Sequence, residues 1–149
     1  MINFVELKKN LAQKLSQTNY AVSEVAQDQL VNYLLLLEKW NQAYNLTSVR
    51  DVKEMVVQHI LDSLSVAEFI KGQKILDVGT GAGLPGIPLA LMMPEREFVL
   101  LDSNGKKTRF LTHVIQTLKI NNVKVVQARA EKFQSENCFD VIISRAFSA

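Results

Sequence analysis

The first half of the chain spaces its apolar residues as amphipathic helices do. Within residues 3–17, 23–43 and 51–72, apolar side chains recur every three or four positions, which predicts three helices that each bury one face. Ser23 and Asp51 stand at the beginning of the second and third ranges, where they can cap the helix. We therefore expect an N-terminal helical region.

The second half changes to short apolar runs rich in β-branched residues. These runs predict buried strands at residues 75–78, 98–101, 123–126 and 141–143. Helical stretches at about 85–92 and 105–118 lie between them, so we expect an α/β fold with a parallel sheet and right-handed crossovers. Residues 1–149 would then form one domain, with a helical part (1–72) and an α/β part (73–149).

Length and composition agree with one globular domain. The chain has 149 residues, of which 48% are hydrophobic and 21% charged, and these values argue against a collagen, a coiled coil or a disordered chain. Its apolar runs fall short of the roughly 18 residues that a membrane-spanning helix needs. The first ten residues, MINFVELKKN, do not resemble a secretory signal. We expect a cytoplasmic protein without membrane association.

The content of cysteine, histidine and charged residues limits which metal sites and which partners we expect. One cysteine, Cys138, and two histidines, His59 and His113, are too few for a zinc cluster, so we expect no metal site. A net charge of +2 and a pI near 8.7 are compatible with a polyanionic partner but do not require one.

A glycine-rich turn, ILDVGTGAGLPG, follows the first predicted strand at residues 75–86. Gly79, Gly81 and Gly83 lack the Cβ atoms that would keep the backbone from turning sharply and from approaching a ligand closely. The helix that follows offers unpaired backbone N–H groups. This arrangement favours an adenine cofactor.

Two cofactor classes compete for this turn. Counted from Gly81, the glycines satisfy the dinucleotide pattern GxGxxG, with Asp102 about twenty residues further on. In dinucleotide folds, however, the first glycine closes the strand, and here Gly79 does so. Counted from Asp77, the pattern resembles motif I of S-adenosylmethionine (SAM) methyltransferases. SAM is favoured, while a dinucleotide and a purely structural turn stay open.

Two carboxylates accompany the glycines. Asp77, still on the first strand, can orient the turn or meet the α-amino group of SAM. Asp102, at the end of the second strand, is placed to accept hydrogen bonds from ribose hydroxyls.

Longer segments make the resemblance more specific. They are KWNQAYNLTSVR (39–50), HILDSL (59–64), DVGTGAGLPGIPLA (77–90), LLDS (100–103), KKTRFL (106–111), ARAEKF (128–133) and ISRAF (143–147). Together they resemble the RsmG family, also called GidB or glucose-inhibited division protein B. The family methylates guanine N7 in bacterial small-subunit (16S) ribosomal RNA, so the resemblance implies SAM as cofactor and 16S rRNA or the small ribosomal subunit as partner.

The resemblance also implies particular cofactor contacts. They are Gly79 and Leu84 in the first loop, Ala130 and Glu131 after the third strand, and Arg145 after the fourth. From the residues alone, Glu131 and Arg145 follow strand ends, on the side of a parallel sheet where ligands bind. The alternative for each is a solvated surface residue.

Further residues allow either a functional or a structural interpretation. The run KKTR at 106–109, like Arg50 and Lys53, could meet RNA phosphates or be a solvated face. His59 and Asp62, three residues apart, are expected to form a buried hydrogen-bonded pair, and His113 to lie on a helix face. For Asn45 and Thr47 the alternatives are a helix cap and a substrate-facing loop.

The chemistry implied by the resemblance needs no dedicated general base. Guanine N7 carries a lone pair and no proton, so positioning supplies the rate. N7 lies in the deep, narrow major groove of A-form RNA, which predicts an irregular or opened target. From the residues, a small-molecule methyltransferase or NAD enzyme and a non-catalytic RNA- or nucleotide-binding module remain as alternatives.

The resemblance implies the sheet of this class of methyltransferases, which has seven strands in the order 3-2-1-4-5-7-6. Only four predicted strands precede Ala149. We therefore expect a Rossmann-like SAM-methyltransferase sheet, truncated after its fourth strand and preceded by the helical region.

Overall fold

The computed structural model describes residues 2–133 and 138–145. Its helices α1, α2, α5 and α6 and all four strands begin and end within one residue of the predicted ranges. Between α4 and β1, and after β3, short 3₁₀ helices (η2 and η3) occur, and η1 is a π-helix. In chain order the elements are α1 (Phe4–Ser16), α2 (Glu24–Tyr44), α3 (Val52–Met55), η1 (Val56–Leu61), α4 (Asp62–Leu64), η2 (Ala67–Phe69), β1 (Lys74–Val78), α5 (Gly86–Met92), β2 (Glu97–Asp102), α6 (Gly105–Leu118), β3 (Val123–Gln127), η3 (Ala130–Lys132) and β4 (Val141–Ile143).

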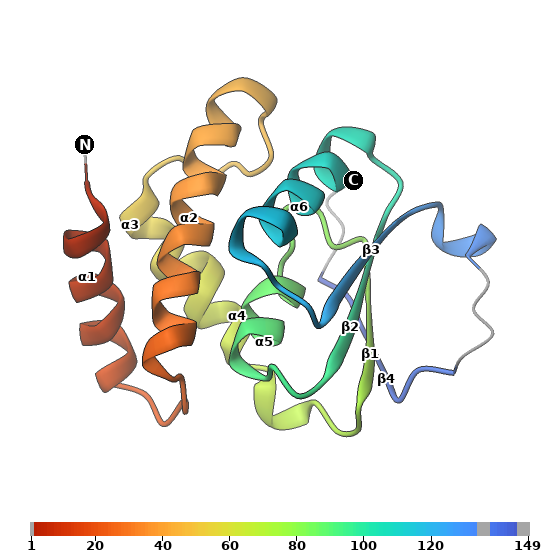
Figure 1. Cartoon of the computed structure of the whole chain (residues 1–149), viewed down its shortest axis with the longest axis horizontal. Coiled ribbons are helices and arrows are strands. Elements are labelled where there is room, and N and C mark those ends of the chain that lie inside the picture. The colour runs from red at the N-terminus through yellow and green to blue at the C-terminus, as the bar shows by residue number, and fades with distance from the viewer. Residues whose placement is uncertain (1, 134–137, 146–149) are drawn as a thin grey trace.

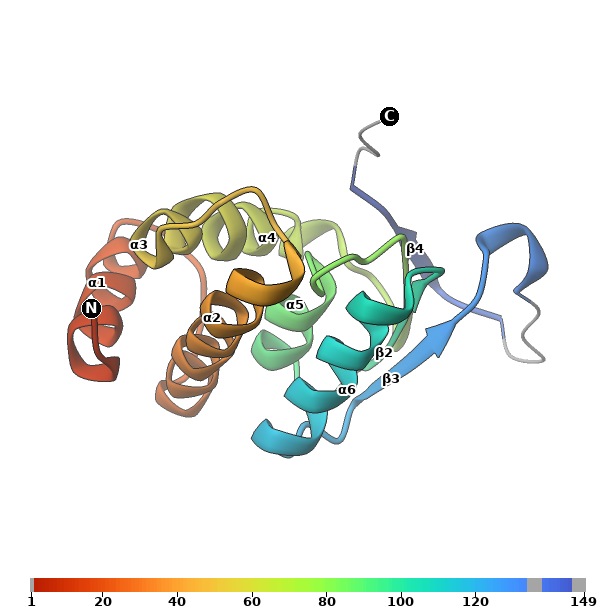
Figure 2. The same cartoon turned by 90° about the horizontal axis from the view of Figure 1, so that it is seen from above.

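The four strands form one parallel sheet in the order β3-β2-β1-β4, as predicted. Figure 2 shows the layers: α5 and α6 lie against the sheet, α2 lies outside them, and α1 is outermost. Figure 1 shows that the helical first half packs beside the α/β half. Because the strands are parallel, their carboxyl ends meet at one edge, where ligands of such sheets bind.

Side-chain caps begin the first three helices, and the two caps predicted from the sequence, Ser23 and Asp51, are confirmed. Asn3 Oδ1 accepts the Glu6 N–H at 2.9 Å, and Ser23 Oγ accepts the Ala26 N–H at 3.1 Å. Asp51 caps α3 through the N–H of Lys53. None of the helices in the described residues is both long and apolar enough to cross a membrane.

The single helix expected over residues 51–72 was wrong in its second half. The helical stretch that begins at Val52, and that includes the π-helix η1, ends at Leu64, and a 3₁₀ helix follows at Ala67–Phe69. Ser65 Oγ donates to the Asp62 carbonyl at 2.6 Å, which is the acceptor that the next helical N–H would use. The N–H of Val66 bonds the Ser63 carbonyl instead, at 3.5 Å. A serine hydroxyl that competes for a backbone acceptor interrupts the helix.

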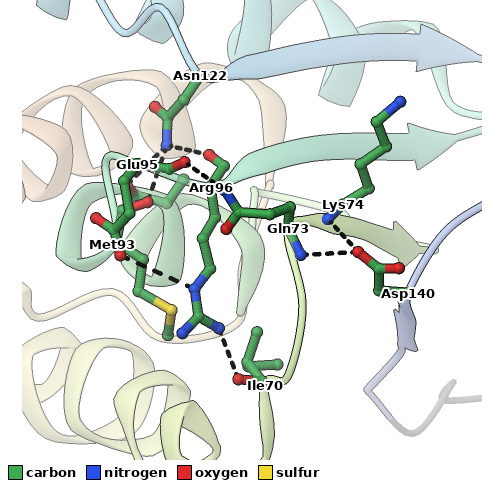
Figure 3. A network of polar contacts seen from close by, with 9 residues as sticks. Ile70, Gln73, Lys74, Met93, Glu95, Arg96, Asn122 and Asp140 are labelled. Atoms are coloured by element: carbon green, nitrogen blue, oxygen red, sulfur yellow. Dashed lines mark hydrogen bonds and ion pairs between the residues drawn. The ribbon is translucent and has the colours of Figure 1, made fainter.

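Polar side chains fasten the amino ends of the strands together (Figure 3). Asn122 Nδ2 donates to the carbonyls of Ala90 and Arg96, both at 3.0 Å, and Arg96 Nη1 donates to that of Ile70 at 2.6 Å. The carboxylate of Asp140, just before β4, accepts the N–H groups of Gln73 and Lys74 at 2.7 and 3.0 Å. This network holds the loops at the edge opposite the strands' carboxyl ends.

Replacement of Asp140 should make stability less dependent on acid pH. The N–H groups of Lys74 and Gln73 hold the pKa of Asp140 below its usual value. The carboxylate therefore stabilises the fold above its unfolded pKa, and this contribution is lost as the pH falls through the folded pKa. Urea unfolding measures this effect: between neutral and acid pH, the free energy of unfolding should fall less for Asp140→Asn than for wild type. Glu68→Gln, an exposed carboxylate, is the control, and equal pH profiles for wild type and Asp140→Asn would contradict this account.

One apolar core joins the helical and α/β halves. Fully buried leucines of α1 and α2 continue into Ile75 of β1 and Phe110 of α6. A buried hydroxyl crosses this core: Tyr33 Oη donates to the Ala82 carbonyl at 2.7 Å. Helix α2 thereby contacts the glycine-rich turn directly and helps to fix its position.

Candidate functional site

The loop between β1 and α5 turns over the carboxyl edge of the sheet. The N–H groups of Gly79 and Thr80 donate to the Leu101 carbonyl at 2.8 and 3.1 Å, which ties the loop to β2. Gly79 and Gly81 have φ of +67° and +61°, a left-handed conformation that glycine adopts without strain. The turn therefore depends on glycine at these positions.

Gly83 and Gly81 serve different purposes. A Cβ at Gly83 would lie 2.6 Å from Ile87 Cγ1 and 2.8 Å from Leu111 Cδ2, so Gly83 lets the loop pack tightly on two helices. A Cβ at Gly81 would meet nothing within 4 Å. Gly81 lies on the open side of the loop and Gly83 on its packed side.

Asp77 is fully buried beneath the loop. Its Oδ2 accepts the Thr80 hydroxyl at 2.8 Å and the Gly86 N–H at 3.0 Å, so it fixes the turn and the start of α5. Burial raises the pKa of Asp77 to about 7, against the opposing effect of these two hydrogen bonds. The side chain does not line the cavity in front of the loop. Of the two roles considered for Asp77, the geometry supports orientation of the turn and not a ligand contact.

Asp102 lies at the cavity, at the end of β2. Its Oδ2 accepts the Gly81 N–H and its Oδ1 the Asn104 N–H, both at 2.8 Å. Each oxygen accepts one hydrogen bond here, which leaves capacity for a second on each. Asp102 both anchors the glycine loop and presents acceptors to the cavity.

A cavity of about 850 Å³ opens at the carboxyl ends of the strands. This volume lies within the range of small-molecule sites, about 300–1,000 Å³. Of the nine predicted site residues, seven line the cavity and Asp77 and Gly83 lie behind it. The seven are Gly79, Gly81, Leu84, Asp102, Ala130, Glu131 and Arg145.

Arg145 reaches the cavity from the end of β4. Its Nη2 lies 3.8 Å from Asp62 Oδ2, and both side chains are substantially exposed. Glu131 reaches the same cavity from η3. Residues 146 and 147, which complete the ISRAF segment, lie outside the described residues.

A histidine–threonine pair also lines the cavity, and the sequence did not predict that these two residues pair. His59 Nε2 and Thr47 Oγ1 are 2.8 Å apart, and both residues line the cavity. Burial, and then the charge of Arg145, lower the pKa of His59, which favours the neutral imidazole.

The expected bond between His59 and Asp62 was wrong. Asp62 is exposed and pairs with Arg145 instead. His59 lies in the π-helix η1, whose i→i+5 turns are wider than those of an α-helix, so residues three apart do not share a face.

Of the remaining residues considered from the sequence, some line the cavity and others have a structural role or lie elsewhere. Asn45 ends α2 in a left-handed conformation, with φ of +52°, so its cap role is confirmed. Thr47 and Lys107 line the cavity, whereas Arg50, Lys53, Lys106 and Arg109 do not. His113 lies on α6, as expected, with its ring 5.2 Å from that of Trp40.

The strand order and the glycine turn define a Rossmann-like methyltransferase fold. Protein-L-isoaspartate O-methyltransferase shares it with a TM-score of 0.58 and 17% sequence identity, over 92% of this chain and 47% of that one. At this identity the likeness concerns the fold.

Sequence comparison then identifies the family. The model of the GidB family, described as rRNA small subunit methyltransferase G, matches residues 26–149. The chain is 57% identical to ribosomal RNA small subunit methyltransferase G of Vibrio cholerae (strain O395), over 96% of this chain and 68% of that protein. It is 55% identical to the protein of the same name from Photobacterium profundum, over 96% and 69%. The chain belongs to the GidB family of small-subunit rRNA methyltransferases.

Proposed function

We propose that this protein transfers a methyl group from SAM to guanine N7 in 16S rRNA, with the rRNA or the small ribosomal subunit as substrate. One observation carries the proposal. The glycine loop, the acid that ends β2 and the polar residues that follow β3 and β4 all line one cavity of about 850 Å³. A ribosomal substrate would place the reaction in the cytoplasm.

The residues of the cavity suit SAM. Gly81 leaves open space where any side chain would intrude, so the backbone can approach the methionine part. The two Asp102 oxygens retain acceptor capacity for ribose hydroxyls. Glu131 and Ala130 lie where the base end of the cofactor would reach past β3, and Arg145 lies beside β4.

The packing of Gly83 argues against a dinucleotide. In a GxGxxG turn counted from Gly81, Gly83 is the second glycine, whose backbone should approach the pyrophosphate. Here Gly83 packs against Ile87 and Leu111 and does not line the cavity. The register that begins at Gly79 fits the geometry better.

The chain's own groups are consistent with methylation at N7. When bound, SAM would supply a methyl group on a positively charged sulfur. The N7 lone pair would form a bond to this methyl group while the methyl–sulfur bond breaks and S-adenosylhomocysteine leaves, and N7 has no proton to lose first. No residue then has to act as a base. The carboxylates of Asp102 and Glu131 line the cavity together with the cationic side chains of Lys107, Arg129 and Arg145, so fixed charges of both signs surround the reactants. The cavity walls position the reactants.

Lys107 should contribute to RNA binding through charge. It is the lysine that lines the cavity, at the start of α6. If it meets a phosphate, the slope of log affinity against log salt should fall by about 0.7–0.9 in Lys107→Gln. A salt titration of RNA binding measures this slope. Lys9→Gln, on the exposed surface of α1, is the control and should leave the slope unchanged, and an unchanged slope in Lys107→Gln would remove this contact.

The test of the function is methyl transfer with defined acceptors. The protein is incubated with SAM labelled in its methyl group and with 16S rRNA, small subunits or a mixture of small-molecule acceptors. We expect label in RNA, at guanine N7 after nuclease digestion and mass spectrometry. Label in the small molecules alone, or at another atom of the RNA, would contradict the proposal.

A further inference from the structure

Three aromatic rings lie in contact across helices α2 and α6. The ring centroid of Trp40 is 5.4 Å from that of Tyr44 and 5.2 Å from that of His113. On its inner side Trp40 also meets the fully buried Phe110, at 5.5 Å. Trp40 is therefore anchored to the core, and Tyr44 and His113 extend the aromatic surface outward.

This aromatic surface, Tyr44–Trp40–His113, begins beside the cavity. Helices α2 and α6 run antiparallel (Figure 1): Gln29 Nε2, near the start of α2, bonds the carbonyl of Leu118, at the end of α6. Tyr44 is the last residue of α2, and Leu46 and Thr47, two and three positions further on, line the cavity. Tyr44 thus stands beside the proposed cofactor site.

The Tyr44 side chain is held in place but remains open to solvent. The residue is 43% exposed although its ring lies against Trp40. Among the described residues, Trp40 provides the one aromatic contact of Tyr44. A ring that packs against one neighbour and belongs to a residue this exposed can offer surface to a flat ligand.

Positive charge flanks the aromatic surface on both sides. Arg50 Nη2 bonds Asn45 Oδ1 at 3.0 Å, directly after Tyr44 in the chain. At the other end, Arg109 and His113 line a second cavity of about 360 Å³ between α6 and β3. Within residues 2–133 and 138–145, neither arginine forms an ion pair. Both charges are available to an anionic partner.

We propose that Tyr44, supported by Trp40, stacks on an unpaired base of the rRNA close to the target guanine. Single-stranded nucleic acid is held by this combination of an aromatic platform and a cationic groove. The proposal rests on the proposed function, since it takes RNA as the substrate. In this arrangement the RNA next to the target guanine runs across α2 and α6, toward Arg109.

The lone tryptophan reports on this contact directly. Trp40 is the single tryptophan of the chain, so its fluorescence reads the aromatic surface without interference. The probes are an unstructured RNA of about twelve nucleotides and heparin, a polyanion without bases. We expect RNA to quench Trp40 and heparin to leave its emission unchanged while still binding.

The variants separate stacking from charge and from folding. Tyr44→Leu should weaken RNA binding about tenfold and leave heparin binding unchanged, since one stacked base is lost. Tyr44→Phe keeps the ring and should bind RNA as wild type does. Phe69→Leu is the matched control, because Phe69 is 68% exposed but lies in η2, before β1, at the opposite edge of the sheet. Thermal melting checks that each variant is folded.

Three results would overturn the stacking contact. They are equal RNA affinity in Tyr44→Leu and wild type, an equal loss of heparin binding, and no RNA binding by the wild-type chain. Failure of the proposed function has a different signature. In that case RNA would still bind through Tyr44, but neither SAM binding nor methyl transfer would be detected.

Discussion

Gly83→Ala is expected to lower the free energy of unfolding by about 2–5 kcal/mol. The new methyl would lie 2.6 and 2.8 Å from carbons of Ile87 and Leu111, and φ at this position is +99°. Overpacking of this kind costs about 1–3 kcal/mol, and a left-handed backbone adds about 1–2 kcal/mol for a residue with a Cβ. Chemical denaturation measures the loss.

Gly81→Ala is the matched control for this prediction. Its φ of +61° carries the backbone penalty, but its Cβ would meet no atom within 4 Å. We expect a loss of stability of about 1–2 kcal/mol from the backbone alone, together with weaker SAM binding, because the methyl enters the cavity. If the two variants were equally stable, or if Gly83→Ala weakened SAM binding in a folded protein more than Gly81→Ala did, the assignment of the packed and open sides of the loop would be wrong.

Asp102→Ala is expected to weaken SAM binding by about 1–3 kcal/mol, or about 5- to 150-fold. The substitution removes the acceptor proposed for the ribose hydroxyls. It also frees the Gly81 N–H, which the carboxylate holds at 2.8 Å. Isothermal titration calorimetry with SAM measures the change.

Asp51→Ala provides the control for Asp102→Ala. Asp51 also accepts a backbone N–H through its carboxylate, but it caps α3 and does not line the cavity. It should lose about 1 kcal/mol of stability and bind SAM as wild type does. Unchanged SAM affinity in Asp102→Ala, or an equal loss in both variants, would show that Asp102 does not hold the cofactor.

The strands were predictable because their physics is local. Each is a short run rich in β-branched and aliphatic residues, and the strand Lys74–Val78 lies between Gly72 and Gly79 in the sequence. The position of the site followed from the same logic, since parallel strands bring Gly79 and Asp102 to one edge. Seven of the nine named site residues line the cavity for this reason.

What escaped prediction depends on contacts between distant segments or on local competition. The Thr47–His59 pair spans a loop and a π-helix, and no periodic pattern marks a π-helix. The early helix end at Leu64 depends on one serine rotamer, which composition does not encode. The Trp40–His113 contact requires the mutual orientation of α2 and α6. Such features become visible only when the elements are placed in space.

The most direct test of the central claim is calorimetric titration of the intact chain with SAM, with S-adenosylhomocysteine and with NAD. The account predicts saturable one-to-one binding of SAM and of its demethylated product, and weaker or undetectable binding of NAD. Tighter binding of NAD, or no binding of either SAM or its product, would contradict the assignment of the glycine loop, Asp102 and the large cavity to SAM.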